Sequence, residues 1–413
     1  MSWIENNLIE LVDIKTGKKD ANQGDENGTF RFYTCAKDYS FIKEYAFDEE
    51  AILVSGNGAY VGYVHYFKGK FDAYQRTYIL SNFKIDVYFL YHYLGEKLRF
   101  RIHREKQDGA TPYITKGTLA KFKVKYPENP AEQTAIATIL SKVDEAIEAT
   151  QNSIKAAEKL KNSLMQNLLT GKLKPDGTLR TDDELQITKY GYAFKDWKYC
   201  KINDLIKEGY ITKVQDGNHG ESHPVAAEFV EAGIPFVMAS DISKGYVDTD
   251  NCKKITKTRA DKLRIGFSYK DDVLISHKAS VGYTCIVEKA EPYIMLTPQV
   301  TLYRVDKQKL IPEYLLYFFQ LYTFQIILEG NAKQSTRNYI GITNQKKMWI
   351  YLPDAIEEQK ELVAPIIKVD KEVIGKQIKI KTLQRLKKSL MQNLLTGKVR
   401  VDLEAINKII SEQ

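Results

Sequence analysis

One segment of this chain occurs twice, and this repetition restricts the possible folds more than any other feature. Residues 160–172 (LKNSLMQNLLTGK) recur at 386–398 (LKKSLMQNLLTGK) with a single difference. The same offset of 226 positions (386 minus 160) extends back without a gap to Pro127 and Pro353. The chain therefore consists of two half-molecules, each a globule followed by a long repeated segment, and the repeated element supplies a shared frame.

Weaker matches continue upstream of each copy. Residues 52–55 (ILVS) match residues 273–276 (VLIS), and the pair Tyr-Ile occurs at both 113–114 and 339–340. The offset slips from 226 to 221 between these matches, as expected where loops differ in length. Since most other residues of the two globules have diverged, we expect them to recognise two different targets with one architecture.

The composition is that of a globular protein large enough for two domains, with 413 residues of which 43% are hydrophobic. The 61 lysines and arginines exceed the 53 acidic residues, and the net charge of +8 is compatible with a polyanionic partner but does not require one. The four cysteines lie far apart without a CxxC pair, which argues against a zinc knuckle or a disulfide framework. Together with the lack of a secretory signal pattern, this predicts a cytoplasmic protein.

The most apolar stretch of the chain is residues 310–328. It contains Pro312 and is interrupted by polar residues such as Gln320 and Gln325. The stretch therefore predicts one buried helix of the second globule and no association with a membrane.

The repeated segment has the periodicity of a long helix that buries one stripe. Its apolar positions step by three and four residues, which predicts an antiparallel coiled coil between the two copies. Pro127 and Pro130 precede the first helix and Gly171 follows it, so the helix would be about 60 Å long at ~1.5 Å per residue. Pro365 is expected to kink or restart the second helix. The stripe consists of Leu140, Val143, Ile147, Thr150, Ile154, Ala157, Lys161, Leu164 and Leu168 in the first copy, and of Ile366, Val369, Val373, Lys376, Ile380, Leu383, Lys387, Leu390 and Leu394 in the second.

Polar residues are repeated as faithfully as apolar ones at the helix ends. Gln166 and Asn167 return as Gln392 and Asn393, although packing of the seam requires only apolar side chains. These four residues are therefore candidates for a surface that binds the same partner twice. A recent duplication would produce the same pattern, and helices that merely join two domains or dimerise the chain remain an alternative.

No catalytic motif stands out in the sequence. The glycine-rich run 56–62 lacks the GxGxxG spacing of a dinucleotide loop, and the Thr-Gly-Lys triplets lack the preceding glycine of a phosphate loop. His219 and His223 have the spacing of helical metal ligands, but the glycines and proline around them exclude a helix. Neither a nucleophile elbow nor an amino-methyltransferase motif occurs.

Loops at matching places in both globules carry cations and amides beside aromatic residues. Arginine and lysine suit guanine edges and phosphates, whereas asparagine and glutamine suit adenine. The candidate DNA-binding residues are Lys18, Lys19, Tyr74, Gln75 and Arg76 in the first globule and Asn218, His219, Lys278, Lys333, Gln334 and Arg337 in the second.

This arrangement resembles the specificity subunit of type I restriction-modification systems, which alternates two target recognition domains with two conserved helices. The resemblance spans nearly the whole chain. Its motifs are the Pro-x4-Glu-Gln pattern that opens each helix, LMQNLLTGK that closes it, Trp3 and Trp197 at the starts of the globules, the turn 216–219, and the segments 233–237 and 109–114. The last of these adds Thr111 to the candidate DNA-binding residues.

The resemblance implies an α+β fold with two mixed α/β recognition domains, two long antiparallel helices in a coiled coil, and a pseudo-twofold repeat. It also implies a subunit without catalytic activity or cofactor, which reads a split, asymmetric site on double-stranded DNA. Two modification subunits would bring S-adenosylmethionine to methylate adenine, and restriction subunits would join for cleavage. The implied segments are recognition domain 1–126, helix 127–174, linker 175–196, recognition domain 197–352, helix 353–400 and tail 401–413.

The first globule departs from the second in length. Trp3 to Ile52 spans 49 positions, whereas Trp197 to Val273 spans 76, so the turn 216–219 has no secure counterpart in the first globule. The short segment before Trp3 is expected to weaken closure between the N-terminal strand and the second helix. Two alternative functions are a coiled-coil scaffold that links two protein-binding modules, and a self-sufficient methyltransferase that would itself bind S-adenosylmethionine.

Overall fold

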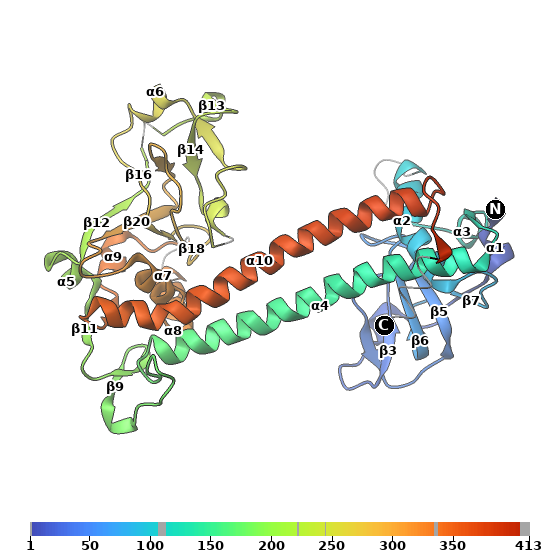
Figure 1. The fold of residues 1–413 in the computed structure, drawn as a ribbon, viewed down its shortest axis with the longest axis horizontal. Helices are drawn as coiled ribbons and strands as arrows, with labels where there is room; N and C mark the ends of the chain where they lie inside the picture. The colour runs from blue at the N-terminus through green and yellow to red at the C-terminus, as the bar shows by residue number, and fades with distance from the viewer. Residues whose placement is uncertain (1, 106–112, 221–222, 244, 334–337, 405–413) are drawn as a thin grey trace. The chain divides into compact units, whose positions relative to one another are not determined.

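The computed structural model describes residues 2–105, 113–220, 223–243, 245–333 and 338–404 (Figure 1). The chain divides into two compact units. Unit 1 comprises Met1–Ser153 together with Lys376–Gln413, and unit 2 comprises Ile154–Gly375. The units therefore do not coincide with consecutive recognition domains and helices, because each long helix contributes residues to both.

The two repeated segments form the long helices α4 (Pro130–Leu168) and α10 (Ile356–Leu394), as the periodicity predicts. Gly171 and Gly397 follow them with φ values of +71° and +70°, the left-handed conformation that commonly ends a helix. Helix α10 continues through Pro365, so of the two predicted outcomes the restart does not occur. Leu362 and Val363 lie in the core of unit 2 beside this proline, and their burial offsets the hydrogen bond that proline cannot donate.

Within each unit the two helices are joined by the same ion pair. Lys387 binds Asp144 at 2.6 Å in unit 1, and Lys161 binds Asp370 at 2.7 Å in unit 2. Both partners are related by the 226-residue offset, so Lys161 and Lys387, two of the polar interruptions of the seam, belong to two copies of one ion pair. In unit 1, Lys376 also donates to Ser153 at 2.5 Å. From Asp144 to Ser153 the residue number rises along α4, while from Lys387 to Lys376 it falls along α10, so the two helices are antiparallel.

Two buried glutamines fix the beginnings of the long helices. Gln133 donates to the carbonyl of Pro127 at 2.8 Å and accepts from the amide of Asp86 at 2.9 Å. Gln359 makes the corresponding bonds to Pro353 at 2.9 Å and from Ile311 at 3.0 Å, and also donates to Lys309 at 2.9 Å. The donor shifts by one position in unit 2 because the counterpart of Asp86 is a proline, which has no amide hydrogen. The Glu-Gln motif is therefore explained by local hydrogen bonding.

The tryptophan at the start of each globule lies against the glycine that follows a long helix. A Cβ at Gly397 would lie 2.9 Å from the Trp3 ring, and a Cβ at Gly171 would lie 3.2 Å from the Trp197 ring. The Trp197 indole donates to Glu358 at 3.0 Å, whereas the buried Trp3 indole nitrogen has no acceptor among the described residues. The contact between the N-terminal strand and the second long helix, which was expected to be weak, is thus present, but it lacks the indole hydrogen bond that Trp197 makes in unit 2.

Unit 1 is built on a six-stranded sheet that is buried on both faces at its centre. Alternate residues of β5 point to opposite cores: Ile52 and Val54 to the one shared with helix α2, and Ala51 and Leu53 to a smaller aromatic one. The sheet order is β2 (Asp13–Thr16), β7 (Thr77–Ser81), β5 (Phe47–Ser55), β6 (Val64–Ala73), β3 (Phe30–Tyr33) and β4 (Ser40–Ile42). Strand β1 (Trp3–Asn7) pairs with β8 (Lys123–Pro127), and the helices are α1 (Leu8–Leu11), α2 (Val87–Glu105) and α3 (Lys116–Ala120).

Unit 2 repeats this plan and adds a second sheet. The first sheet has the order β12 (Ile211–Asp216), β20 (Val300–Val305), β17 (Val273–Ser276) and β18 (Thr284–Ile286), and β11 (Lys198–Lys201) pairs with β21 (Trp349–Leu352). The added sheet has the order β13 (Phe229–Val230), β15 (Lys253–Ile255), β14 (Ile234–Val237), β19 (Ile294–Leu296) and β16 (Phe267–Ser268). The helices are α5 (Ile202–Lys207), α6 (Lys257–Ala260), α7 (Pro312–Gln320), α8 (Tyr322–Lys333) and α9 (Ile342–Lys346). The segment expected to be a linker is instead the hairpin of β9 (Leu185–Thr188) and β10 (Gly191–Phe194), and Tyr190 and Ala193 in it belong to the core.

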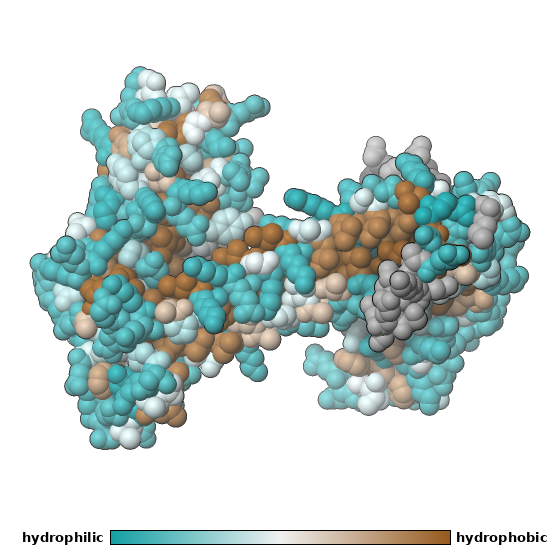
Figure 2. All heavy atoms as spheres, viewed as in Figure 1, coloured by the Kyte–Doolittle hydropathy of each residue, from teal (hydrophilic) through white to brown (hydrophobic). Residues whose placement is uncertain are grey.

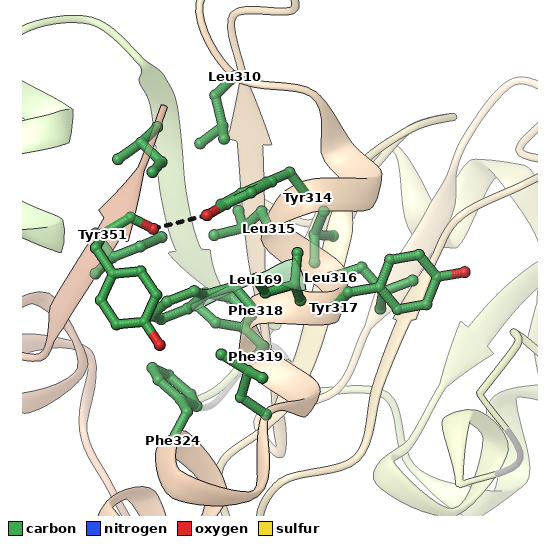
Figure 3. Packing of buried hydrophobic residues seen from close by; sticks show 14 of the residues in the cluster. Leu169, Leu310, Tyr314, Leu315, Leu316, Tyr317, Phe318, Phe319, Phe324 and Tyr351 are labelled. Atoms are coloured by element: carbon green, nitrogen blue, oxygen red, sulfur yellow. Dashed lines mark hydrogen bonds between the residues drawn. The ribbon is translucent and has the colours of Figure 1, made fainter. Parts of the chain in front are cut away.

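The core of unit 2 is centred on α7, which is buried on nearly all sides (Figure 3). The predicted single helix over 310–328 is instead two, because α7 ends at Gln320 and α8 begins at Tyr322. This break allows the Phe319 and Phe324 rings to stack at 5.0 Å, an approach that five residues along one straight helix would not permit. Among the described helices, none combines the length and apolar character needed to cross a membrane.

Candidate nucleic-acid interface

The turns 16–19 and 216–219 occupy the same place in their units. Strands β5 and β17, which the sequence match relates, pair with β7 and β20 and thereby place Tyr78 and Thr301 at one position of the frame. The first residue of turn 16–19 lies opposite Tyr78, and the first residue of turn 216–219 lies opposite Thr301. Turn 16–19 is therefore the structural counterpart of turn 216–219, for which no secure counterpart was predicted from the sequence.

The two turns share only their second residue, Gly17 or Gly217, where a close approach of the backbone leaves no room for a side chain. A Cβ at Gly17 would lie 1.8 Å from the carbonyl oxygen of Ala73, and a Cβ at Gly217 would lie 2.1 Å from that of Thr297. Glycine is thus needed where each turn crosses the chain that leads into the next strand. The other three residues of each turn are free to diverge, which is why comparison of the sequences alone missed the match.

In unit 1, turn 16–19 lies beside the loop of residues 74–76. Lys19 and Tyr74 form a parallel β-bridge, and the amide of Gln75 donates to the carbonyl of Lys19 at 2.9 Å. Gln75 also donates from its side chain to Asp20 at 2.9 Å, and Tyr74 is half-buried. Arg76 is exposed, as is Lys18, and no hydrogen bond or ion pair joins either side chain to another described residue. The structure thus brings together Lys18, Lys19, Tyr74, Gln75 and Arg76, and leaves the Lys18 and Arg76 side chains available to a ligand.

The loop after β5 joins the same site. The amide of Gly56 donates to the carbonyl of Arg76 at 2.9 Å, and the amide of Ile114 donates to the carbonyl of Gly56 at 2.7 Å. Asn57 forms an antiparallel bridge with Tyr113. Thr111, predicted to bind DNA, lies outside the described residues.

Unit 2 repeats these connections with different side chains. The amide of His277 donates to the carbonyl of Gln299 at 2.9 Å, the amide of Ile340 donates to the carbonyl of His277 at 3.0 Å, and Lys278 bridges to Tyr339. The Lys278 side chain is exposed and makes no hydrogen bond or ion pair with a described residue. The loop that carries it is thus held at the same sheet edge as its counterpart in unit 1.

The remaining predicted residues of unit 2 differ in accessibility. His219 is exposed, and its Nδ1 lies 3.2 Å from the carbonyl oxygen of Gly217. Asn218 is only 2% exposed and its backbone N–H donates to the carbonyl of Leu296, so it lies in the interior and not at a surface that a base could reach. Lys333 is exposed at the end of α8 and paired with Glu329. Gln334 and Arg337 lie outside the described residues.

Two exposed tyrosines were left out of the predicted site although the sequence contains their signal. Tyr113 is 65% exposed and Tyr339 is 40% exposed. They are identical and follow the 226-residue offset, while the loops around them diverge. Each is bridged to the strand-end loop of its own unit, so both belong to the candidate interface.

A second matched surface lies at the C-terminal parts of α4 and α10. Gln166 and Gln392 are exposed, and neither side chain is bonded to a described residue. Leu160 is 52% exposed and Leu386 is 46% exposed, and Figure 2 shows apolar atoms along α10 within unit 1. The Asn167 side chain is bonded within its own helix, because it donates to the carbonyl of Ser163 at 2.8 Å. Asn393 is half-buried, and its backbone carbonyl accepts from Val399 at 3.3 Å.

Each copy of this helix end borders a cavity. The two cavities contain matched methionines, Met391 in unit 1 and Met165 in unit 2. The first measures about 180 Å³ and is lined by Gly62, Tyr63, Val64, Tyr91, His92, Gly95, Lys387 and Met391. The second measures about 310 Å³ and is lined by Asn162, Met165, Gln166, Gln320, Leu321, Tyr322 and Gln325.

Comparison with known proteins relates the whole arrangement to one family. The family model described as type I restriction modification DNA specificity domain matches residues 2–159 and 195–385. The specificity subunit of the type I restriction enzyme EcoDI from Escherichia coli is 35% identical over 170 residues, which cover 41% of this chain and 37% of that protein. The MjaVIII specificity subunit from Methanocaldococcus jannaschii is 23% identical over 366 residues, which cover 87% of this chain and 81% of that protein. The crystal structure of the type I S subunit from M. genitalium has the same fold, with a TM-score of 0.66, 14% identity, and coverage of 95% of this chain and 96% of that one.

Proposed function

We propose that this chain, which belongs to the family of type I restriction modification DNA specificity domains, reads DNA for a restriction-modification complex. Each unit would read one half of a bipartite, asymmetric site on double-stranded DNA. The observation that carries the proposal is the placement of diverged, partly cationic loops at the same sheet edge of both units.

The chemistry of these loops supports the proposal. Arg76 and Lys18 in unit 1 and Lys278 in unit 2 are exposed cations without ion-pair partners among the described residues, as phosphate and guanine contacts require. The exposed tyrosines beside them offer a face for stacking or a hydroxyl for a phosphate. Since the frame is common and the loops differ, the two half-sites would differ in sequence.

The repeated helix ends are proposed to bind two copies of a modification subunit, one at each copy. Gln166 and Gln392 are exposed polar residues without described partners, and an exposed leucine and a cavity accompany each of them. The modification subunits would carry S-adenosylmethionine, this chain would bind no cofactor and catalyse nothing, and restriction subunits would join for cleavage. Because α4 and α10 contribute to both units, their length would set the spacer between the half-sites. Four inserted residues would add about 6 Å, or at most about two base pairs.

The decisive experiment is methylation profiling of DNA from cells that carry this chain and its modification partner. Exchange of residues 1–125 for those of another family member should change one half of the methylated sequence and leave the other half intact. A change in both halves would contradict independent reading. The alternative of a scaffold for protein-binding modules predicts no site-specific methylation, and no binding to duplex DNA that weakens steeply with salt.

Partner binding is tested separately by native mass spectrometry of the complex. Gln166→Ala and Gln392→Ala should each weaken one of two bound modification subunits, so that a one-to-one complex accumulates. Lys155→Ala, an exposed substitution on α4, is the control and should retain the two-to-one complex. Retention of both subunits by the double glutamine variant would show that these residues do not bind the partner.

A further inference from the structure

A buried cluster of hydrogen bonds lies beneath the loops of unit 2 that carry the candidate DNA contacts. Its centre is the hydroxyl of Thr301 on β20, whose side chain is completely buried. This oxygen lies 2.7 Å from the carboxylate of Asp216, 2.7 Å from Nδ1 of His277 and 3.0 Å from the amide nitrogen of Gln345. Gln345 and His277 are 1% and 2% exposed, so water does not substitute for their bonds to the hydroxyl, whereas the Asp216 side chain is 21% exposed.

The valence of the hydroxyl assigns every proton in the cluster. A hydroxyl has one hydrogen to donate and two lone pairs to accept with. The carboxylate of Asp216 only accepts, so the Thr301 hydrogen points to it, and the Gln345 amide donates to one lone pair. His277 must then donate from Nδ1 to the other. Burial lowers the pKa of His277 and thus favours the neutral ring, and the bond to Thr301 places the single ring proton on Nδ1. All three bonding positions of the hydroxyl are therefore occupied.

Each partner of the hydroxyl holds a different loop. Asp216 begins the turn that carries His219, and His277 begins the loop that carries Lys278. Gln345 also donates to the carbonyl of Ile340 at 3.0 Å and accepts from the hydroxyl of Tyr303 at 2.8 Å. Ile340 follows the exposed Tyr339, so one buried oxygen connects the three loops.

The loop after His277 is held in a conformation that it would not adopt alone. Ala279 has a φ of +65°, which is uncommon for a residue with a side chain. Its amide donates to the carbonyl of Asn338 at 3.0 Å, and its carbonyl accepts from the Asn338 side chain at 3.2 Å. The His277 ring packs edge-on against Tyr339 with centroids 5.5 Å apart. The surface positions of Lys278 and Tyr339 thus depend on what fixes His277 beneath them.

We propose that the Thr301 hydroxyl is a positioning group for base discrimination by unit 2. By bonding three loops at once it would set their relative positions, so that loss of the hydroxyl relaxes the reading of the second half-site. This inference rests on the proposed function, because it assumes that these loops read DNA.

Unit 1 fixes its loops by a different hydrogen bond. Loss of the Thr301 hydroxyl is therefore expected to reduce base discrimination at the second half-site only. At the position of Thr301 it has Tyr78, whose hydroxyl donates directly to the carbonyl of Ile114 at 2.8 Å. Leu119, 226 positions before Gln345, is a buried apolar residue. The hydroxyl-centred cluster is therefore specific to unit 2.

The test compares Thr301→Val, which keeps the shape and removes the hydroxyl, with Thr301→Ser, which keeps the hydroxyl. Each variant is assembled with its modification subunits, and methylation rates are measured on the recognised site and on sites with one base changed in either half. Thr301→Val should lose on the order of tenfold in discrimination at the second half-site, within the range that one base contact supplies, and none at the first. Thr301→Ser should discriminate as the unsubstituted protein does.

Four outcomes would overturn the inference. These are unchanged discrimination by Thr301→Val, equal losses by both variants, a loss at both half-sites, and a fall in total rate without a change in discrimination. If Thr301→Val yields no folded complex, Tyr303→Phe replaces it. That variant removes only the bond to Gln345 and should give a smaller loss at the second half-site, and unchanged discrimination would again overturn the inference. Absence of any bipartite specificity in the unsubstituted complex would instead refute the proposed function.

Discussion

The two units place different chemistry at the same point of one frame. In unit 1 the buried His92 on α2 lies 3.1 Å from the hydroxyl of Ser141 on α4. The residues 226 positions later are Phe318 and Ile367, which belong to or pack against the apolar core of unit 2. A polar pair in one unit is thus replaced by an apolar pair in the other. The frame tolerates either chemistry as long as both partners change together.

The residues that remain identical have another role. Gln133 and Gln359 are buried and bind backbone groups, and Gly171 and Gly397 adopt the left-handed conformation that ends each helix. A core volume can be filled in many ways, whereas an unpaired backbone group or a left-handed residue has few solutions. Identity between the units therefore marks backbone requirements, and divergence marks packing and recognition.

The largest effect should come from breaking this shared backbone requirement. Gln133→Leu leaves two backbone groups unpaired and should lower the free energy of unfolding of unit 1 by about 3 kcal/mol, whereas Gln359→Leu leaves three and should cost unit 2 about 4 kcal/mol. Hydrogen exchange resolved by segment, at increasing urea, measures each unit separately. The control for unit 1 is Gln151→Leu and the control for unit 2 is Gln308→Leu, both at exposed glutamines, and each should change stability by less than about 0.5 kcal/mol.

The histidine pair predicts a difference in acid sensitivity. Burial lowers the pKa of His92 from 6.5 to about 4, so the unfolded chain binds a proton here at a higher pH than the folded unit does. The free energy of unfolding of unit 1 should fall as pH drops from about 6.5 to about 4, by at most about 3.5 kcal/mol at ~1.4 kcal/mol per pKa unit, and this contribution should be constant above that window. The double variant His92→Phe, Ser141→Ile transfers the pair of unit 2 and should abolish this loss.

The measurement is hydrogen exchange of α2 amides between pH 4 and 7, corrected for the intrinsic exchange rate. Amides of α7 are the internal control, because the substitutions lie in unit 1. If the double variant kept the full acid sensitivity of unit 1, His92 would not be its source.

The smallest effect should come from the repeated ion pair. Lys161→Met leaves Asp370 accepting a hydrogen bond from Tyr317 at 2.8 Å, whereas Lys387→Met leaves Asp144 beside a neutral His92 at 3.8 Å. Since all four groups are partly exposed, Lys387→Met should cost about 1 kcal/mol and Lys161→Met about half of that. Urea unfolding of the two variants decides the matter, and equal losses would show that the neighbouring tyrosine does not compensate.

Sequence patterns predicted the parts of the fold that follow local rules. The long helices, their C-terminal glycines and the seam were predicted from periodicity and repetition. The counterpart of turn 216–219 was missed because strand pairing defines it and only Gly17 and Gly217 are shared. Burial of Asn218 and the break after Gln320 depend on tertiary packing, which a single segment does not encode. The glutamines were recognised as a motif, but their hydrogen bonds join residues up to 50 positions apart.

The chain segments that form each unit determine the order in which the units can fold during synthesis. Unit 2 is one continuous stretch, whereas unit 1 joins Met1–Ser153 to a segment that begins at Lys376. Met391, Leu394 and Leu395 complete the core of unit 1, so that core stays open on the ribosome until the last part of the chain emerges. At about 5–20 residues per second, synthesis of the intervening 222 residues (154 to 375) takes roughly 10–45 s. The unit that is synthesised first is therefore the one that finishes folding last.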